Sequence, residues 1–186
     1  MTLPRKHSFH RECVQGLRRF GVQQACPLCR AELPPGPDKL FAEATERYFA
    51  LDRRQQMLEQ PWQNMAKADR DSAMEVAASW QQAAVQGHSG AQSNLGFSYK
   101  NGHGVRQSLE EAARWWRKAA DQENAEAQFC LAISNKNGQG VSQSFEKAAR
   151  WWRKAADQGH ANARFNLATS YHNGEGVRQS FTEAAR

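Results

Sequence analysis

The sequence predicts an all-α protein in which most of the chain forms an α-solenoid, preceded by a small zinc-binding module. Two observations predict the solenoid: a segment recurs with a period of 36 residues, and each copy has the spacing of two short helices. A third observation predicts the zinc module, because all cysteines but one lie in the first 29 residues. The mean hydropathy of -0.83 favours apolar side chains placed regularly against neighbouring helices and argues against a large single-core enzyme.

Charge and apolar runs exclude several classes of protein. Six basic and two acidic residues lie among residues 1–37, so +4 of the net charge of +6 is there and the remainder is nearly balanced. The later helices mix both signs, which favours a solvated surface over a nucleic-acid-binding stripe. The apolar runs are short, the longest being Phe129 to Ile133, and the first ten residues lack a signal-peptide core. We therefore expect an intracellular protein, cytoplasmic or nuclear, without a membrane span.

The first element, residues 1–31, carries a cluster of metal-binding residue types. The pattern His-x-x-His-x-x-Cys is followed after twelve residues by Cys-x-x-Cys. Thiolate and imidazole are the usual ligands of zinc in proteins, and an intracellular chain does not favour disulfides. The predicted Zn²⁺ ligands are His7, His10, Cys13, Cys26 and Cys29.

The segments HSFHRECV and ACPLCR together resemble the second half of a RING finger. The resemblance implies that His7, Cys26 and Cys29 belong to one zinc site, and that His10 and Cys13 belong to the other. It also implies that Pro27, Leu28 and Arg30 contact a ubiquitin-conjugating enzyme. A chain of this kind acts as a ubiquitin ligase without a catalytic nucleophile of its own, and its repeats hold the target.

The chain departs from the RING pattern in its ligand count. The leading Cys-x-x-Cys is absent and Arg5 stands where the pattern has a cysteine, so five of the eight ligands are present. A module whose folding depends on bound metal is expected to fold poorly with this incomplete set of ligands. One alternative is a single tetrahedral site made by His10, Cys13, Cys26 and Cys29. Two further alternatives are a scaffold with a degenerate zinc finger and a zinc module that binds nucleic acid.

Residues 32–73 read as a Pro-rich spacer followed by a linker helix. The stretch AELPPGPDKL, residues 31–40, is expected to be non-helical. After it, Phe41, Ala44, Tyr48 and Leu51 recur every three or four residues and predict an amphipathic helix to about Glu59. We expect this helix to pack on the first repeat as a cap; pairing with another chain is the alternative.

Residues 74–186 contain the repeats. Residues 104–122 recur at 140–158 with 16 of 19 positions identical, and the copy begins again at 176–186. A more divergent first copy begins near Met74.

Each copy predicts two helices joined by a glycine turn. The first helix carries Ala and Leu four residues apart on one face, as in the pair Ala127 and Leu131, and ends at Asn-Gly-x-Gly. The second begins at a serine N-cap, namely Ser108, Ser144 or Ser180. Glu111 and Glu183 complete a Ser-x-x-Glu capping box in two copies.

The remaining side chains of the repeats receive structural interpretations. Packing against a neighbouring helix is predicted for Leu109, Ala112, Ala113, Trp116 and Ala120, and also for Cys130. Trp115 and Trp151 lie about 100° round the helix and are expected to be partly buried. The histidines at repeat junctions are expected to be solvated turn residues: His88, His103, His160 and His172.

These units resemble the Sel-one-like repeat (SLR), a relative of the tetratricopeptide repeat. The resemblance covers residues 74–186 and implies a right-handed α-solenoid that serves as an adaptor for a protein partner. Alanine replaces the repeat's usual glycine at Ala132 and Ala168. Because Arg186 falls in mid-helix, the last repeat is incomplete and we expect the chain to be a fragment or an incomplete gene product.

Overall fold

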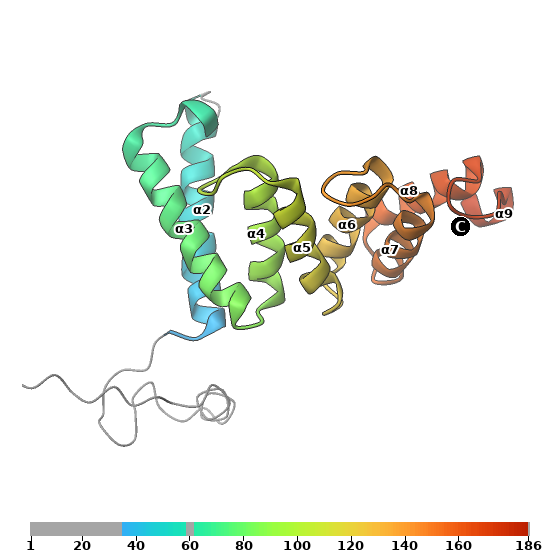
Figure 1. Cartoon of the computed structure of the whole chain (residues 1–186), viewed down its shortest axis with the longest axis horizontal. Coiled ribbons are helices and arrows are strands. Elements are labelled where there is room, and N and C mark those ends of the chain that lie inside the picture. Colours follow the sequence, from blue (N-terminus) through green and yellow to red (C-terminus); the bar gives the residue numbers. More distant parts are fainter. Residues whose placement is uncertain (1–34, 59–61, 186) are drawn as a thin grey trace, which may run out of the picture. The chain divides into compact units, whose positions relative to one another are not determined.

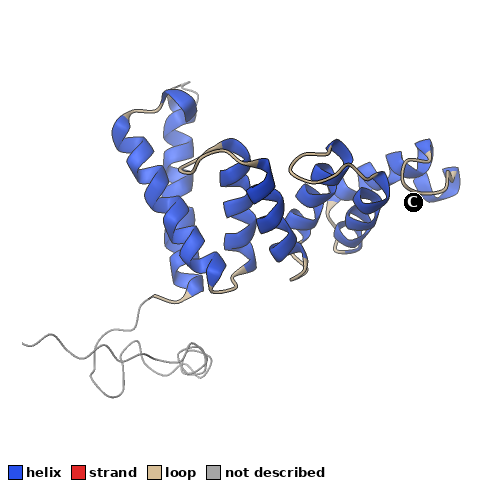
Figure 2. Ribbon diagram, in the orientation of Figure 1, coloured by secondary structure: helices blue, strands red, loops and turns tan. Residues whose placement is uncertain are grey.

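The computed structural model describes residues 35–58 and 62–185 of the chain. The chain divides into two units, Met1–Gly36 and Pro37–Arg186, and every described helix lies in the second unit. Throughout these described ranges the regular elements are helices and no strand is present (Figure 2). In chain order they are α2 (Pro37–Met57), the 3₁₀ helix η1 (Trp62–Asn64), α3 (Lys67–Val85), α4 (Ser89–Asn101), α5 (Leu109–Ala120), α6 (Ala125–Asn137), α7 (Phe145–Asp157), α8 (Ala161–Asn173) and α9 (Phe181–Ala184).

Each helix packs mainly on the helices before and after it in the chain (Figure 1). The pairs α4–α5, α6–α7 and α8–α9 are the predicted helix-turn-helix units, and the second unit of the chain is thus an α-solenoid. Met74, where the first copy is predicted to begin, lies within α3, and Trp80 of α3 is buried like its equivalent Trp116 of α5.

The helix α2 caps the first repeat, as the sequence predicts. Leu40 and the partly buried Phe41 pack with Leu95 of α4, while Ala44 and Leu51 are buried against α3. The expectation of a non-helical segment up to residue 40 is wrong, because α2 begins at Pro37. Proline is favourable at the first position of a helix, and Asp38 in the first turn interacts well with the helix dipole.

The serine caps of the second helices are confirmed, but the capping box is not completed at Glu111. The hydroxyl of Ser108 accepts a hydrogen bond from the N–H of Glu111 at 3.2 Å, and Ser144 and Ser180 cap their helices in the same way. The N–H of Ser108 donates to the carbonyl of Tyr99 at 2.9 Å, so it does not need the carboxylate. The Glu111 carboxylate pairs instead with Arg114 at 2.7 Å.

Two glycines in each turn have different tasks. The first, as in Gly138, takes a left-handed conformation (φ +68°) that ends the preceding helix. The second approaches the helix of the previous repeat so closely that a Cβ on Gly140 would lie 2.0 Å from the carbonyl oxygen of Leu109. Gly104 meets Ala73, and Gly176 meets Phe145, with the same geometry. This contact recurs every 36 residues and holds successive repeats in register.

Tryptophan packing depends on the residue opposite each indole. A Cβ on Gly96 would lie 2.4 Å from Nε1 of Trp116, so this glycine makes room for the indole to donate to the Ser93 carbonyl at 3.2 Å. In the next repeat Ala132 takes the glycine position, and Nε1 of Trp152 is buried without a hydrogen-bond partner. The alanine replacement therefore preserves burial of the tryptophan and costs it a hydrogen bond.

The expectation that Trp115 and Trp151 are only partly buried is wrong, since they are 8% and 9% exposed. Cationic side chains cover both rings: Lys118 lies over Trp115 at 3.9 Å, and Lys154 over Trp151 at 4.7 Å. Arg117, from the previous repeat, also lies over Trp151 at 5.1 Å. Long cationic side chains can cover apolar surface while their charged ends stay in water. Helical periodicity treats lysine and arginine as exposed residues, so it does not reveal that they cover these tryptophans.

Candidate functional site

A groove between α2, α3 and α4 is the strongest candidate for a binding site in the described chain. Its volume is about 260 Å³. The three helices that form it lie next to one another in Figure 1. The groove is lined by Thr45, Tyr48, Phe49, Trp80, Asn94, Phe97, Ser98 and Asn101.

The aromatic walls of the groove are held by contacts behind them. The indole N–H of Trp80 donates to Thr45 Oγ1 at 3.2 Å, and the Tyr48 ring packs on Trp80 with 5.0 Å between centroids. Phe97 makes an edge contact with Trp116 at 5.5 Å. Phe49 is 55% exposed, whereas Trp80 is 2% exposed. The groove is thus a preformed aromatic surface with one large apolar side chain open to solvent.

Three polar side chains in the groove, Ser98, Asn94 and Asn101, have no hydrogen-bond partner among the described residues. The hydroxyl of Ser98 is buried without a hydrogen bond, and an unsatisfied buried hydroxyl costs about 1–3 kcal/mol. The side-chain amides of Asn94 and Asn101 also form no hydrogen bond to any described residue. A ligand that supplied polar atoms here would satisfy groups that the fold leaves unpaired. No base lies beside the hydroxyl among the lining residues, so the arrangement favours binding over catalysis.

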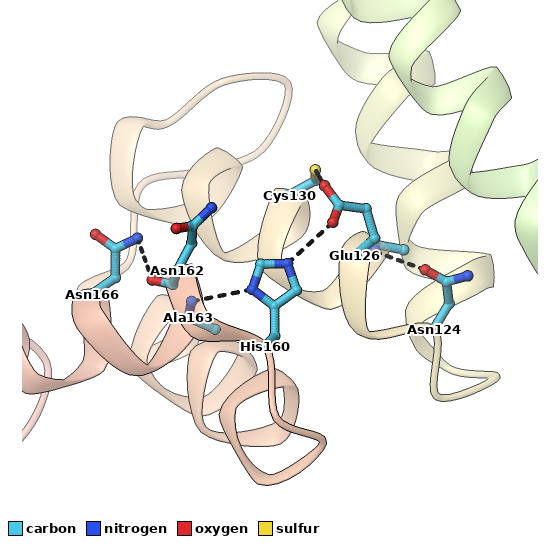
Figure 3. A network of polar contacts seen from close by, with 8 residues as sticks. Asn124, Glu126, Cys130, His160, Asn162, Ala163 and Asn166 are labelled. Carbon is cyan, nitrogen blue, oxygen red and sulfur yellow. Dashed lines mark hydrogen bonds and ion pairs between the residues drawn. The ribbon is translucent and has the colours of Figure 1, made fainter. Parts of the chain in front are cut away.

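A second polar cluster joins α6 to the start of α8 (Figure 3). The Glu126 carboxylate lies between two side chains, 3.1 Å from His160 Nε2 and 3.8 Å from Cys130 Sγ. His160 Nδ1 accepts the N–H of Ala163 at 3.2 Å and caps α8. Both imidazole nitrogens are occupied and the histidine does not reach the thiol, which excludes a nucleophile–base pair. Burial, with the nearby Glu126 charge, raises the pKa of Cys130 far above its usual range, so the thiol is inert.

The same arrangement occurs at His88, two repeats earlier. His88 caps α4 through Ala91, stacks on Phe41 at 4.2 Å and lies 3.6 Å from Asp38. The prediction that His88 and His160 are solvated turn residues is wrong, because their side chains are 20% and 14% exposed. A helix N-cap is a place where an imidazole can accept a backbone N–H. The aromatic ring and the carboxylate come from the helix two before it in the chain, α2 for His88 and α6 for His160.

The other two histidines differ from each other. His103 stacks on Trp62 at 3.9 Å and is not a solvated turn residue, and desolvation by burial lowers its pKa below 6.5. His172 is exposed, as predicted, and touches the Phe181 ring edge-on. Cys130 is a buried packing residue, also as predicted.

The predicted zinc ligands and enzyme-contact residues lie outside the described residues: His7, His10, Cys13, Cys26, Pro27, Leu28, Cys29 and Arg30. Within residues 35–58 and 62–185, no group of three or more His, Cys, Asp or Glu side chains could hold a metal ion. None of the helices in those ranges is both long and apolar enough to cross a membrane.

The apolar periodicity of the helices does not reveal the groove, because it marks only their buried faces. Phe97 lies half a turn away from the buried face of Ala91 and Leu95, on the side of α4 for which the periodicity predicts exposure to solvent. An aromatic residue on that face, next to the exposed Phe49 of α2, is the signal that could have found the groove.

The fold defines a protein of stacked helical hairpins, with a groove formed by three of its helices. A family model described as Sel1 repeat matches residues 89–124, 125–160 and 161–186, which is more than half of the chain. The chain therefore belongs to the Sel1 repeat family. A comparison with curated protein sequences gives no match.

Three solved structures are similar to this chain, and the first of them supports the fold. The Sel1 repeat protein from Oxalobacter formigenes is 24% identical over 94% of this chain with a TM-score of 0.64, and the match covers 61% of that protein. A protective antigen of uropathogenic Escherichia coli strains with an SLR fold is 23% identical, with 76% of this chain and 36% of the antigen covered and a TM-score of 0.48. Cysteine rich protein B of Helicobacter pylori is 18% identical, with 66% and 93% covered and a TM-score of 0.48.

Proposed function

We propose that this Sel1 repeat chain is a protein-interaction scaffold, and that the groove between α2, α3 and α4 receives an apolar side chain of a protein partner. The observation that carries this proposal is the exposed ring of Phe49 in a groove whose walls include Tyr48, Trp80 and Phe97. A volume of about 260 Å³ is smaller than most small-molecule sites and fits one side chain of a larger ligand.

The free faces of the following helices extend this surface. Phe97, Ile133 and Thr169 occupy equivalent positions in α4, α6 and α8, and an asparagine follows each of them one turn later. These amides, of Asn101, Asn137 and Asn173, form no hydrogen bond to any residue of the described chain. An amide offers one donor group and one acceptor, which is what a peptide main chain needs.

The placement of these amides favours an extended ligand. They lie on the first helix of each of three successive repeats, α4, α6 and α8. A partner segment that runs along the repeats across these helices would meet one free amide in each repeat. Side chains between these positions reach Phe97 and Ile133, and a residue at one end of the segment enters the groove.

Selection from a random twelve-residue peptide library on the immobilised full chain tests this function. We expect one class of recovered peptides to lose affinity for both the Phe97→Asp and the Phe49→Asp variant. Phe181→Asp is the matched control, because Phe181 is 63% exposed and lies outside the groove. Recovery of no peptide whose affinity falls in both groove variants would contradict the proposal.

We further propose that residues 1–31 bind at least one Zn²⁺ ion and place the scaffold in a ubiquitin-ligase context. The order of donors in HSFHRECV and ACPLCR supports this, since His10, Cys13, Cys26 and Cys29 suffice for one tetrahedral zinc site. Pro27, Leu28 and Arg30 would contact a ubiquitin-conjugating enzyme.

Zinc counted by native mass spectrometry tests the module. We expect at least one ion per chain, lost in Cys26→Ala and retained in Cys130→Ser, which removes the only cysteine outside the cluster. Ubiquitin-chain formation with a panel of conjugating enzymes is then expected to need Arg30. A chain without zinc supports the degenerate finger, and zinc with steeply salt-dependent affinity for DNA or RNA supports the nucleic-acid module.

A further inference from the structure

We propose that a second pocket, which we term the arginine pocket, docks an acidic protein segment that carries one large apolar side chain. The pocket is formed by η1, the beginning of α3 and the α4–α5 turn, and its volume is about 350 Å³. It shares no lining residue with the groove. It is lined by Trp62, Met65, Arg70, Ala73, Met74, Gly102, Gly104, Val105 and Arg106.

The floor of the pocket is apolar and preformed. The Trp62 ring is stacked between Tyr48, at 5.5 Å, and His103, at 3.9 Å, so its orientation is fixed from both sides. Met65 is 4% exposed, whereas Met74 is 59% exposed. Methionine side chains adapt their shape to different apolar ligands. An exposed methionine beside a fixed indole thus provides a surface on which an apolar side chain gains contact area.

The rim of the pocket is positively charged without compensation. Arg70 and Arg106 are both exposed, and neither forms an ion pair with a described residue. No aspartate or glutamate lines the pocket. The nearby Asp69 is already bound, by Arg54 at 3.1 Å and by Gln55 at 3.2 Å. Two arginines on the second helices of the repeats are neutralised locally: Arg114 pairs with Glu111 and Arg150 with Glu146.

The combination of these features identifies the ligand by its chemistry. Tryptophan, methionine and arginine are the residue types enriched in protein interfaces, and tryptophan and arginine dominate their binding energy. Two unpaired arginines complement carboxylates, whereas the floor complements a leucine-sized or aromatic side chain. A nucleic acid would use the arginines and leave the exposed Met74 without a role. An acidic protein segment uses both.

The repeats supply a matched control for the charge. Arg178 stands two periods after Arg106, in the equivalent turn, is exposed and lies outside the pocket. A charge reversal there changes the net charge as much as a reversal at either pocket arginine does, and it leaves the arginine pocket intact. Reversal of exposed charges changes the stability of a fold little.

The experiment selects a random twelve-residue peptide library on the full chain and, in parallel, on the Arg70→Glu/Arg106→Glu variant. We expect the unmodified chain to enrich peptides with one large apolar residue flanked by aspartate or glutamate, and the double variant not to enrich them. A synthetic peptide from this pool, followed by fluorescence anisotropy, is expected to bind the double variant at least about tenfold more weakly. Met74→Ala should weaken the same peptide severalfold, and added salt should weaken it as well.

Affinity for Arg178→Glu and for the groove variant Phe97→Asp should stay within about twofold of the unmodified chain. Failure of the groove proposal thus leaves this test unaffected. Enrichment of no acidic peptide, equal loss in Arg178→Glu, or indifference to Met74→Ala would each overturn the proposal. A polyanion such as heparin that binds through the arginines regardless of Met74 would identify a general anion site and also overturn it.

Discussion

The glycine contact between repeats gives the sharpest prediction about the fold. Gly138 and Gly140 have almost the same backbone conformation, with φ of +68° and +70°. They differ in their surroundings: a Cβ on Gly138 would come no closer than 3.3 Å to Gln143, whereas one on Gly140 would lie 2.0 Å from the Leu109 carbonyl oxygen. Alanine substitution at the two sites therefore separates backbone strain from the clash between repeats.

The expected magnitudes follow from these two terms. Alanine in the left-handed region costs roughly 1–2 kcal/mol, partly offset by about 0.4–1 kcal/mol from a stiffer unfolded chain. Gly138→Ala should therefore destabilise the fold by about 1 kcal/mol or less. Gly140→Ala adds the displacement of a packed helix, which typically costs about 1–3 kcal/mol, and should exceed Gly138→Ala by about 2 kcal/mol.

Urea denaturation of the full chain, followed by far-UV circular dichroism, measures this difference. Stability in repeat proteins is distributed over neighbouring interfaces, so hydrogen exchange of α5, α6 and α7 should show which interface is weakened by the substitution. Gly140→Ala is expected to lower amide protection on both sides of the junction. Equal stabilities for the two variants would refute the argument that close approach at Gly140 holds the repeats in register.

Three further predictions concern buried side chains. Gly96→Ala should destabilise the fold by about 1–3 kcal/mol in thermal melts, because its Cβ would displace Trp116 from its hydrogen bond; a neutral effect would show that the indole adapts freely. Burial lowers the pKa of His103 below 6.5, so the unfolded chain takes up this proton first and stability falls as the pH drops below 6.5. His103→Gln should remove that part of the pH dependence of the urea midpoint, and an unchanged profile would contradict it. Cys130, whose pKa burial raises, should be alkylated by iodoacetamide at pH 8 only as fast as the chain opens, as peptide mass spectrometry can follow; rapid alkylation of the folded chain would oppose this.

The hairpin architecture is predictable from the sequence because local signals and the repeat agree. The serine caps, the terminating glycines and the Ala–Leu face each indicate the same helix boundaries in successive copies. Repetition strengthens each signal, since a pattern that recurs after 36 residues must satisfy the same packing in every copy. The position of α2 as a cap follows from its amphipathic spacing in the same way.

Contacts between repeats are less predictable, because they depend on side chains that are distant in the sequence. His160 is buried by Phe129 and held by Glu126, which lies 34 residues earlier. Trp151 is covered by Arg117 of the preceding repeat. Periodicity places these residues on the outer part of a helix, and only the crossing of neighbouring helices determines what covers them.

The groove was not predictable for a related reason. Phe49 and Phe97 belong to different elements, one in the cap helix α2 and one in the repeat of residues 89–124. None of the three matched repeats includes α2. The spacing predicts each helix separately. The groove arises where their free faces meet.

Photo-cross-linking tests most directly whether the groove between α2, α3 and α4 holds a protein partner. Benzoylphenylalanine would replace Phe97, and in a separate sample Phe181. Each full-length chain would be irradiated with a library peptide whose affinity falls in the Phe97→Asp variant. We expect a cross-linked product from position 97 and none from position 181. A product from position 181 alone, or equal products from both positions, would contradict the assignment of the groove as the docking surface.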